Sequence, residues 1–405
     1  MIFFSDPLHD DFASLALGFA PYGGSDFGEI QAVALEVKEG DDGSFHDSFV
    51  KLAHRRIEEG DAAAAKGHRV SAHDCYLRAV CFLGVAYHPL YGTPVDPRLV
   101  DTFHLEMNTF DRAMEMLDPP GEKLDIPYEN TTMPGYFLRA PGHANEVRPV
   151  VVVGGGWDST YDLNHVGIGV AALRRGYHVL LHDGPGQGRP LIDEGLPLRH
   201  DWEKVVTPVV DAALAIDVVD PDRIVYHAWS LGGYMAPRAA AYEHRLGAIV
   251  ADPGQLDVGV KFFGIMKMFG LDDAAVARLP ALDPDDEKKA LDAIESNRSL
   301  RWKILQRGYW TNAATDLSSY LVEMAKWKLE PDEVAAIQCP TLITAAESDP
   351  VSSNAKALYD GLTCPKTFIE FQDADGAGAH CEALNRSMAN RVIIDWLDET
   401  LNVHG

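Results

Sequence analysis

Beyond residue 120, short apolar runs alternate with helical segments, and this alternation restricts the fold more than any other feature of the sequence. The runs predict strands in the order KLDIPYEN, MPGYFLRAP, RPVVVVGG, YHVLLHDG, DRIVYHAWS, LGAIVADP, PTLITAAES and KTFIEFQD. The first two are typical of a hairpin. Most of the others are apolar almost throughout, as parallel strands are when both faces are buried. The sequence therefore predicts an α/β fold with a mostly parallel central sheet and helices on both faces.

A helical region precedes the strands. Residues 44–118 carry apolar positions at helical spacing, and we expect breaks at Gly60, Gly67 and Pro89. A Pro-Pro-Gly sequence then ends the pattern. We therefore expect a helical N-terminal cap domain over residues 1–120.

The second domain, residues 121–405, contains a helical insertion at about 254–335, between the strands LGAIVADP and PTLITAAES. This segment is far longer than a plain crossover connection requires. We expect it to form a lid over the site together with the N-terminal helices. Its large apolar side chains are candidates for an apolar substrate pocket: Phe262, Phe263, Met266, Met268, Trp302 and Trp310.

Composition excludes several classes of protein. The formal net charge is −26 over 405 residues, which opposes binding to nucleic acid or to an anionic membrane surface. Acidic residues interrupt the apolar N-terminus before a signal-length segment forms, and no later run is long enough to cross a membrane, so we expect a cytoplasmic protein. The five cysteines contain no CxxC pair, so neither a disulfide framework nor a zinc site is indicated.

The stretch IVYHAWSLGGYMAPRAAA predicts a strand, a very tight turn and a helix, with Ser230 at the apex of the turn. This arrangement is typical of a nucleophile elbow, whose usual pattern is G-x-S-x-G. Here the first glycine is replaced by Ala228, which is still small enough for a turn that brings backbone segments close together. An ordinary helix-capping serine is the alternative interpretation. We expect Ser230 to be a nucleophile.

Partners for that serine follow it in the order acid, then histidine. Asp349 comes directly after the strand PTLITAAES, where a carboxylate can orient an imidazole. His380 lies on a glycine-containing loop after the strand KTFIEFQD, and it is our candidate general base. Glu347 and Asp252 also lie at strand ends, so they stay open as alternative acids.

An acyl-type reaction also needs backbone N–H donors for a developing oxyanion. Leu231, directly after the serine, supplies one candidate donor. Trp157 supplies the other, on the loop GGGWDST after the strand RPVVVV. That loop lacks the spacing of a phosphate-binding motif. The glycine-rich HDGPGQGRP is expected to be a tight structural loop rather than a source of chemistry.

Together these motifs resemble a branch of the α/β-hydrolase superfamily that includes 2,6-dihydroxypseudooxynicotine hydrolase and fungal hydrolases that shorten polyketides in melanin biosynthesis. The matching residues are GGWDS at 155–159, DGPGQG at 183–188, SLGGY at 230–234, Asp349, and GAGAHCE at 376–382. The resemblance implies an α/β-hydrolase fold, a triad of Ser230, Asp349 and His380, and a cap of N-terminal helices. It also implies a homodimer and activity on carbon–carbon bonds next to a ketone as well as on esters.

The acidic residue of the resembling family's GG-x-E/D-S loop falls on Asp158. Its carboxylate has two interpretations. It could cap the helix that follows, because DST is a favourable start for a helix. Alternatively, burial could raise its pKa, so that it donates a proton to a leaving carbanion or binds a substrate hydroxyl.

We therefore expect a serine-dependent hydrolase, without metal or organic cofactor, acting on a small ketone- or ester-containing molecule of polyketide-like or aromatic type. Acyl transfer or cyclisation on the same fold is one alternative. A catalytically silent relative that binds a ligand is another, although a binding protein has no need for a serine, an acid, a histidine and an oxyanion loop together.

Overall fold

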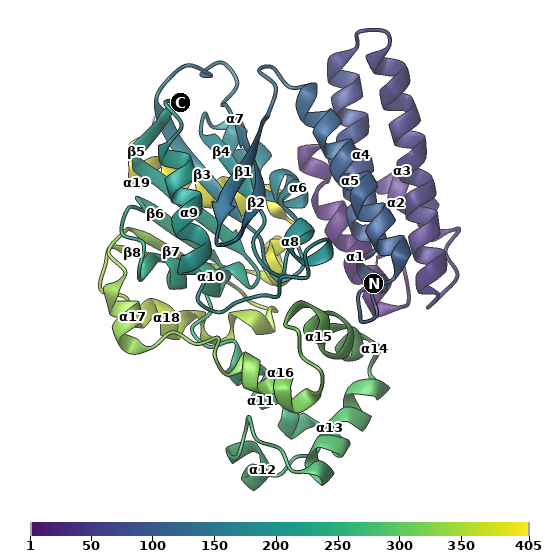
Figure 1. The fold of residues 1–405 in the computed structure, drawn as a ribbon, viewed down its shortest axis with the longest axis vertical. Helices are drawn as coiled ribbons and strands as arrows, with labels where there is room; N and C mark the ends of the chain where they lie inside the picture. The colour runs from purple at the N-terminus through teal and green to yellow at the C-terminus, as the bar shows by residue number, and fades with distance from the viewer. Residues whose placement is uncertain (1, 404–405) are drawn as a thin grey trace.

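The computed structural model of the protein describes residues 2–403, and a sheet with the strand order β1-β2-β4-β3-β5-β6-β7-β8 lies at its centre (Figure 1). The strands are β1 (Glu122–Tyr128), β2 (Thr131–Leu138), β3 (Arg148–Gly154), β4 (His178–His182), β5 (Val219–Trp229), β6 (Ala248–Asp252), β7 (Thr341–Ala346) and β8 (Lys366–Phe371). β1 pairs antiparallel with β2, and β2 with β4, whereas the other pairs are parallel. This confirms the mostly parallel sheet expected from the sequence.

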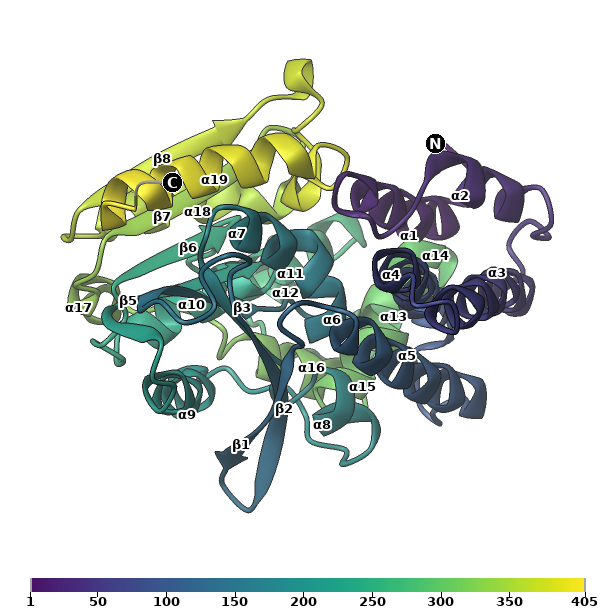
Figure 2. The same ribbon diagram turned by 90° about the horizontal axis from the view of Figure 1, so that it is seen from above.

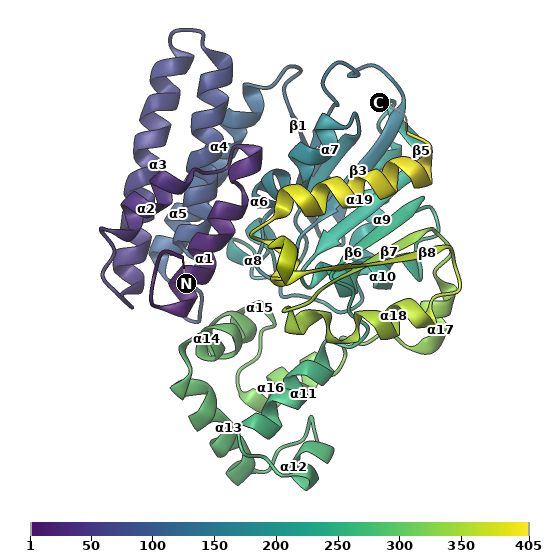
Figure 3. The ribbon, with the colours of Figure 1, turned by 180° about the vertical axis from the view of Figure 1, so that it is seen from behind.

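Helices cover both faces of the sheet. Figure 3 shows α19 (Arg386–Leu401) running across one face, with α7 (Val170–Arg174) beside it. On the opposite face lie α9 (Glu203–Leu214) and α10 (Gly232–Ala240), as the view from above also shows (Figure 2). Each face has its own apolar core, because β3 and β5 alternate their valines and aromatic residues between the two sides. The predicted α/β-hydrolase architecture is therefore confirmed.

The N-terminal helices pack beside this sheet and share a third core (Figure 1). They are α1 (Pro7–Gly18), α2 (Phe27–Ala34), α3 (Asp42–Ala64), α4 (Arg69–Ala86) and α5 (Pro97–Glu115). Aspartates cap the starts of several of them; Asp6, for example, accepts the backbone N–H of His9 at 3.0 Å, and proline follows it at the first position of α1.

One expected break is wrong, because Gly60 lies inside α3 rather than at its end. A Cβ at this position would lie 2.4 Å from the ring of Tyr76 on α4. Glycine therefore allows the two long helices to pack closely, and its helix-weakening effect is outweighed by that contact. Gly67 lies between α3 and α4 with a φ of +74°, so the expected break after α3 is present.

The segment between β6 and β7 is built mainly of helices joined by loops, with one isolated β-bridge between Asp257 and Lys328. Its elements are α11 (Gly259–Met268), α12 (Asp273–Ala277), α13 (Pro284–Ser296), α14 (Arg298–Leu300), η4 (Arg301–Gly308), α15 (Tyr309–Thr311), α16 (Leu317–Met324) and α17 (Pro331–Ala336). It touches the N-terminal helices, since Arg298 forms ion pairs with Asp6 and Asp42. Trp302 is buried in the N-terminal core.

Short helices complete the chain: η1 (Ala20–Tyr22), η2 (His88–Leu90), α6 (Tyr161–Asn164), η3 (His165–Gly169), α8 (Gly188–Ile192), η5 (Pro350–Asn354), α18 (Ala355–Gly361), η6 (Asp373–Asp375) and η7 (His380–Glu382). None of the helices between residues 2 and 403 is both long and apolar enough to span a membrane.

Candidate active site

Ser230 lies at the tight turn between β5 and α10, and its φ of +57° is in the left-handed region that side chains other than glycine rarely adopt. Three hydrogen bonds hold the turn. The Ser230 N–H donates to the carbonyl of Asp252 at 2.7 Å, and the Ser230 carbonyl accepts from the Gln255 side chain at 2.6 Å and from the Gly233 N–H at 2.9 Å. The strand, strained turn and helix of a nucleophile elbow are therefore present.

Small residues surround this turn, as its geometry requires. A Cβ on Gly232 would lie 2.7 Å from the Cβ of Ala228, and one on Gly154 would lie 3.0 Å from the same atom. Ala228 therefore packs its methyl group against two glycines. This explains why alanine is tolerated where the usual elbow pattern has glycine.

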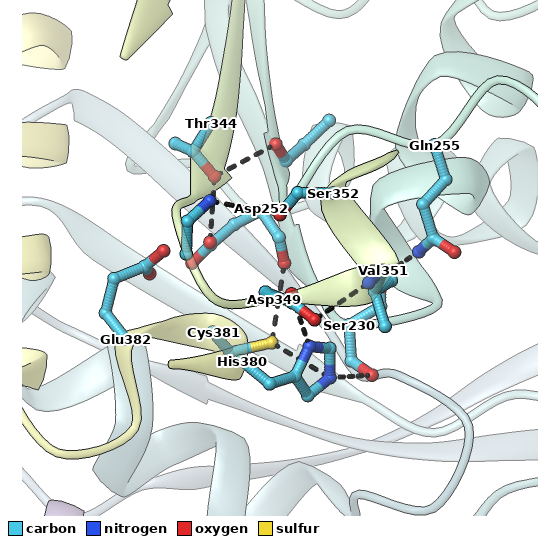
Figure 4. A network of polar contacts seen from close by, with 12 residues as sticks. Ser230, Asp252, Gln255, Thr344, Asp349, Val351, Ser352, His380, Cys381 and Glu382 are labelled. Carbon is cyan, nitrogen blue, oxygen red and sulfur yellow. Dashed lines mark hydrogen bonds and ion pairs between the residues drawn. The ribbon is translucent and has the colours of Figure 1, made fainter. Parts of the chain in front are cut away.

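The imidazole of His380 lies between Ser230 and Asp349 (Figure 4). Its Nε2 is 3.0 Å from Oγ of Ser230, and its Nδ1 is 2.7 Å from Oδ2 of Asp349. The Asp349 side chain is 1% exposed, whereas that of His380 is 43% exposed. A carboxylate beside Nδ1 favours the tautomer with hydrogen on that nitrogen, which leaves Nε2 free to accept a proton from the serine hydroxyl.

The two other carboxylates that the sequence left open lie in different surroundings. Asp252 is fully buried, and its carboxylate contacts Arg386 at 3.1 Å and accepts the Thr344 hydroxyl at 2.9 Å. Glu347 accepts the N–H of Asp373. The structure thus brings Asp349, rather than Asp252 or Glu347, to His380.

Behind the histidine, a buried arginine organises the loop that carries it. Arg386, at the start of α19, donates to the carbonyl of Cys381 at 2.7 Å and lies 3.2 Å from the Glu382 carboxylate. Burial acts to raise the pKa of Asp252, but Arg386 and His227 act in the opposite direction and outweigh burial. The pKa of Asp252 therefore lies below its ordinary value. Asp252 is therefore an ionised structural partner.

The loop after β3 lies against Ser230. A Cβ on Gly156 would be 2.6 Å from the Cβ of Ser230 and 3.1 Å from its Oγ, so only glycine fits here. Among the hydrogen bonds of residues 2–403, none uses the backbone N–H of Trp157 or of Leu231. These residues directly follow Gly156 and Ser230 in the chain, so their N–H groups stay candidates for the oxyanion donors.

Gln187, which sequence reasoning assigned to a merely structural loop, fixes the loop after β3. Its side chain donates to the carbonyl of Gly156 at 2.6 Å and accepts the N–H of Gly184 at 3.0 Å. The side chain is buried. The clue in the sequence was a lone amide among the glycines of DGPGQG, because a buried amide needs partners on both its ends.

Asp158 does not cap the following helix, and its pKa is not raised, so the cap and the raised pKa are both wrong, whereas binding of a substrate hydroxyl by its carboxylate stays a prediction. The residue before α6 is Thr160, and the Asp158 carboxylate instead lies 3.1 Å from Nη1 of Arg307 on η4. Burial acts to raise the pKa of Asp158, but Arg307 and His88 act in the opposite direction and outweigh burial. The pKa of Asp158 therefore lies below its ordinary value. The side chain is 24% exposed and ionised at neutral pH.

The expected pocket residues are divided among different environments. Phe262 packs edge-on against Trp157, with ring centroids 5.9 Å apart, and Met266 is fully buried in the same core, whereas Phe263 is partly buried against it. Trp302 and Trp310 both pack on Tyr91 of the N-terminal region.

Met268 is 82% exposed, so it does not line an enclosed pocket, and that expectation is wrong. A cavity of about 60 Å³ lies beside Asp158. Its lining comes from the N-terminal region, the loop after β3, α6 and the end of β5: Phe12, Leu15, Phe19, His88, Asp158, Ser159, Leu163 and Trp229. In the described residues 2–403, no group of three or more metal-ligating side chains is arranged to hold an ion.

Comparison with known proteins agrees with this geometry. Residues 150–392 match the family model described as the alpha/beta hydrolase family. Hydrolase LUC6 of a Fusarium species is 31% identical, with 96% of this chain and 95% of that protein covered. The 20-hydroxy-prefusarin hydrolase FUS2 of Gibberella moniliformis is 30% identical over 99% of this chain and 98% of its own.

Among solved structures, 2,6-dihydroxy-pseudo-oxynicotine hydrolase is similar with a TM-score of 0.74 and 21% identity, covering 95% of each chain, so it shares the fold. The branch that the sequence motifs indicated is thereby confirmed. The chain belongs to the alpha/beta hydrolase family, where it groups with these fungal hydrolases.

Proposed function

We propose that the protein is a serine hydrolase in which Ser230, His380 and Asp349 form the catalytic triad. The observation that carries this proposal is the continuous chain of contacts from the Ser230 hydroxyl through His380 to the buried carboxylate of Asp349, at 3.0 Å and 2.7 Å. A binding protein has no need of a serine in a strained conformation with a base and an acid in line behind it.

In the proposed reaction, the Ser230 oxygen attacks a substrate carbonyl while Nε2 of His380 accepts the hydroxyl proton. Asp349 holds the imidazole in position and stabilises its protonated form. The N–H groups of Trp157 and Leu231 donate to the oxyanion of the tetrahedral intermediate. His380 then returns the proton to the leaving group, and a water molecule, activated by the same imidazole, releases the acyl group from Ser230.

For the substrate, we propose a small ketone- or ester-containing molecule of polyketide-like or aromatic type. The names of two similar proteins support this class, since one is a 20-hydroxy-prefusarin hydrolase and the other acts on 2,6-dihydroxy-pseudo-oxynicotine. Cleavage of a carbon–carbon bond next to the carbonyl is part of the proposal. The same acyl-enzyme could pass its acyl group to another nucleophile, and product analysis with an added alcohol distinguishes transfer from hydrolysis.

The cap-and-lid arrangement of the N-terminal helices and the insertion stays a prediction. The homodimer is also a prediction, and sedimentation analysis tests it.

The experiment is a screen of activated esters alongside 1,3-diketones, run with the natural protein and with Ser230→Ala. We expect the substitution to lower kcat by at least about 10⁴-fold and to abolish labelling by a fluorophosphonate, without a change in thermal stability beyond a few degrees. Ser71→Ala, at an exposed position on α4, is the matched control and should keep both properties. Substantial turnover by the Ser230 variant would refute the proposal.

A further inference from the structure

Two turns with a left-handed backbone lie at the serine of the candidate triad and next to its histidine. Ser230 has a φ of +57°. Cys381 and Glu382, which directly follow His380, have φ values of +52° and +46°. Residues other than glycine rarely adopt this conformation, and they keep it only where surrounding contacts hold them. The position of His380 relative to Ser230 therefore depends on the contacts that hold both turns.

Both turns meet at Asp252, the last residue of β6. Its backbone carbonyl accepts the Ser230 N–H at 2.7 Å. The same carbonyl accepts the Cys381 thiol at 3.7 Å (Figure 4). The Asp252 carboxylate lies 3.1 Å from Nη1 of Arg386, which also donates to the Cys381 carbonyl at 2.7 Å. Asp252 and Arg386 thus connect the turn of the serine to the loop of the histidine.

The guanidinium of Arg386 is itself fixed inside the protein. The side chain is 1% exposed, and its Nη2 donates to Oδ1 of Asn390 at 2.9 Å. It also lies 5.0 Å from the centre of the ring of Trp229, the residue before Ser230. A planar guanidinium points several N–H groups in fixed directions, whereas an ammonium group is a compact point charge. Arg386 therefore contacts both turns from one buried position.

We propose that Arg386 is a positioning residue, which acts through Asp252 and the Cys381 carbonyl to set the separation of the serine and histidine side chains. This inference rests on the proposed function, because that separation limits the rate only if the histidine accepts the serine proton. A displacement of about 1 Å between reacting groups lowers a rate by about 100-fold. Both side chains of the ion pair are buried, so their loss should reduce kcat and leave KM nearly unchanged.

The test uses Arg386→Lys, which keeps the positive charge but replaces the guanidinium with a single ammonium group. On para-nitrophenyl acetate, we expect kcat to fall by about 30-fold to 100-fold and KM to change by less than about three-fold. Labelling by a small fluorophosphonate should slow by a similar factor, because that reaction needs the same serine and histidine. The number of labelled sites at the end point corrects both rates for unfolded protein.

Arg238→Lys is the matched control. Arg238 lies on α10, about two helical turns after Ser230, and its side chain is 12% exposed. Like Arg386, it pairs with a carboxylate and stacks on an aromatic ring, here Glu203 and Tyr242. Its substitution should lower the melting temperature but change kcat per labelled site by less than about two-fold.

A double variant, Arg386→Met with Asp252→Asn, provides a second test in case the lysine variant does not fold. It removes both charges of the ion pair together, so that neither is left buried without its partner. Burial raises the pKa of the Glu382 carboxyl well above its ordinary value, which favours the neutral form there. The Asp252 backbone carbonyl stays in place, but the Cys381 carbonyl loses its donor, so we expect a similar fall in kcat.

A value of kcat per labelled site within about three-fold of the natural protein, in either Arg386 variant, would overturn the inference and leave the proposed hydrolase intact. An equal fall in Arg238→Lys would also overturn it, because the loss would then follow from general destabilisation. If the natural protein neither hydrolyses the ester nor reacts with the fluorophosphonate, the proposed function is refuted, and the inference with it.

Discussion

Gln187 offers the sharpest test of how the loop after β3, which carries the proposed oxyanion donor of Trp157, is held in place. Gln187→Met keeps the length and approximate volume of the side chain, but it removes the bonds to the Gly156 carbonyl and the Gly184 N–H. Both backbone groups belong to buried residues. Leaving two buried polar groups without partners costs about 1–3 kcal/mol each, or about 2–6 kcal/mol together, and the lower end applies if the loop shifts to regain solvent.

That shift is what should reduce activity. Because Gly156 lies against Ser230, movement of its carbonyl also moves the neighbouring Trp157 N–H. A displacement of about 1 Å, or the loss of one oxyanion donor, lowers kcat by about 100-fold. We therefore expect kcat on para-nitrophenyl acetate to fall about 100-fold with KM changed by less than about three-fold, because the donor acts mainly on the transition state.

Gln187→Glu separates the two bonds. Its carboxylate still accepts the Gly184 N–H but has no hydrogen to give to the Gly156 carbonyl at neutral pH. It should therefore show the same fall in kcat as Gln187→Met. Thermal unfolding of both variants reports the cost in stability. If kcat stays within about three-fold of the natural protein while the melting temperature drops, Gln187 supports the fold without positioning the oxyanion donors.

Two further predictions concern the surroundings of the site. Gly156→Ala places a methyl group 2.6 Å from the Cβ of Ser230 and should lower kcat by about 100-fold or more, whereas Gly264→Ala, where an added Cβ meets nothing within 4 Å, should leave kcat unchanged. Burial and the charge of Asp162 raise the pKa of the Glu106 carboxyl in the folded protein. The protonated carboxyl therefore stabilises the fold. This contribution is fully present below the pKa of Glu106 in the unfolded chain, and it is lost as pH rises through the pKa of Glu106 in the folded protein. Glu106→Gln, which mimics the protonated form, should make the melting temperature fall less between about pH 5 and pH 8 than in the natural protein. Parallel curves would contradict this.

The parts of the fold and site that could be predicted from the sequence share a local origin. Ser230 and Asp349 lie directly after or close to the end of an apolar run, and His380 lies on the loop that follows another one. The end of a strand is encoded by a few neighbouring residues. Parallel strands bring such ends to one edge of the sheet, so local patterns were enough to place three side chains together. The helical insertion was likewise visible from its length and its apolar spacing.

The parts that sequence reasoning missed depend on contacts between distant segments. Arg307 meets Asp158 across 149 positions, and nothing near either residue indicates the pair. Met268 was expected in a pocket because it is apolar, but the face that α11 buries depends on how the insertion docks. The helix α1 was more accessible to prediction, since Asp6 and the proline after it are a favourable N-cap pair.

The ionised state of Asp158 changes what it can do in carbon–carbon cleavage. A proton donor must be protonated when the bond breaks, yet Arg307 and His88 outweigh burial and hold the pKa of Asp158 below its ordinary value. His380, whose Nε2 faces the Ser230 hydroxyl, is the group that accepts the serine proton in the proposed reaction. We therefore expect His380, rather than the ionised Asp158, to return the proton to the leaving enolate.

Asp158→Asn should therefore lower cleavage of a 1,3-diketone and of para-nitrophenyl acetate by similar factors, because it removes the ion-pair partner of Arg307 rather than a proton donor. The natural protein should also keep its diketone activity from about pH 7 to pH 8. A reaction that depended on protonated Asp158 would instead decline as pH rises through the lowered pKa of that residue, and it would be lost well below neutral pH. Steady-state rates on both substrates across this range measure the two effects. A loss on the diketone more than about ten-fold greater than that on the ester would refute this reasoning and restore Asp158 as a chemical participant.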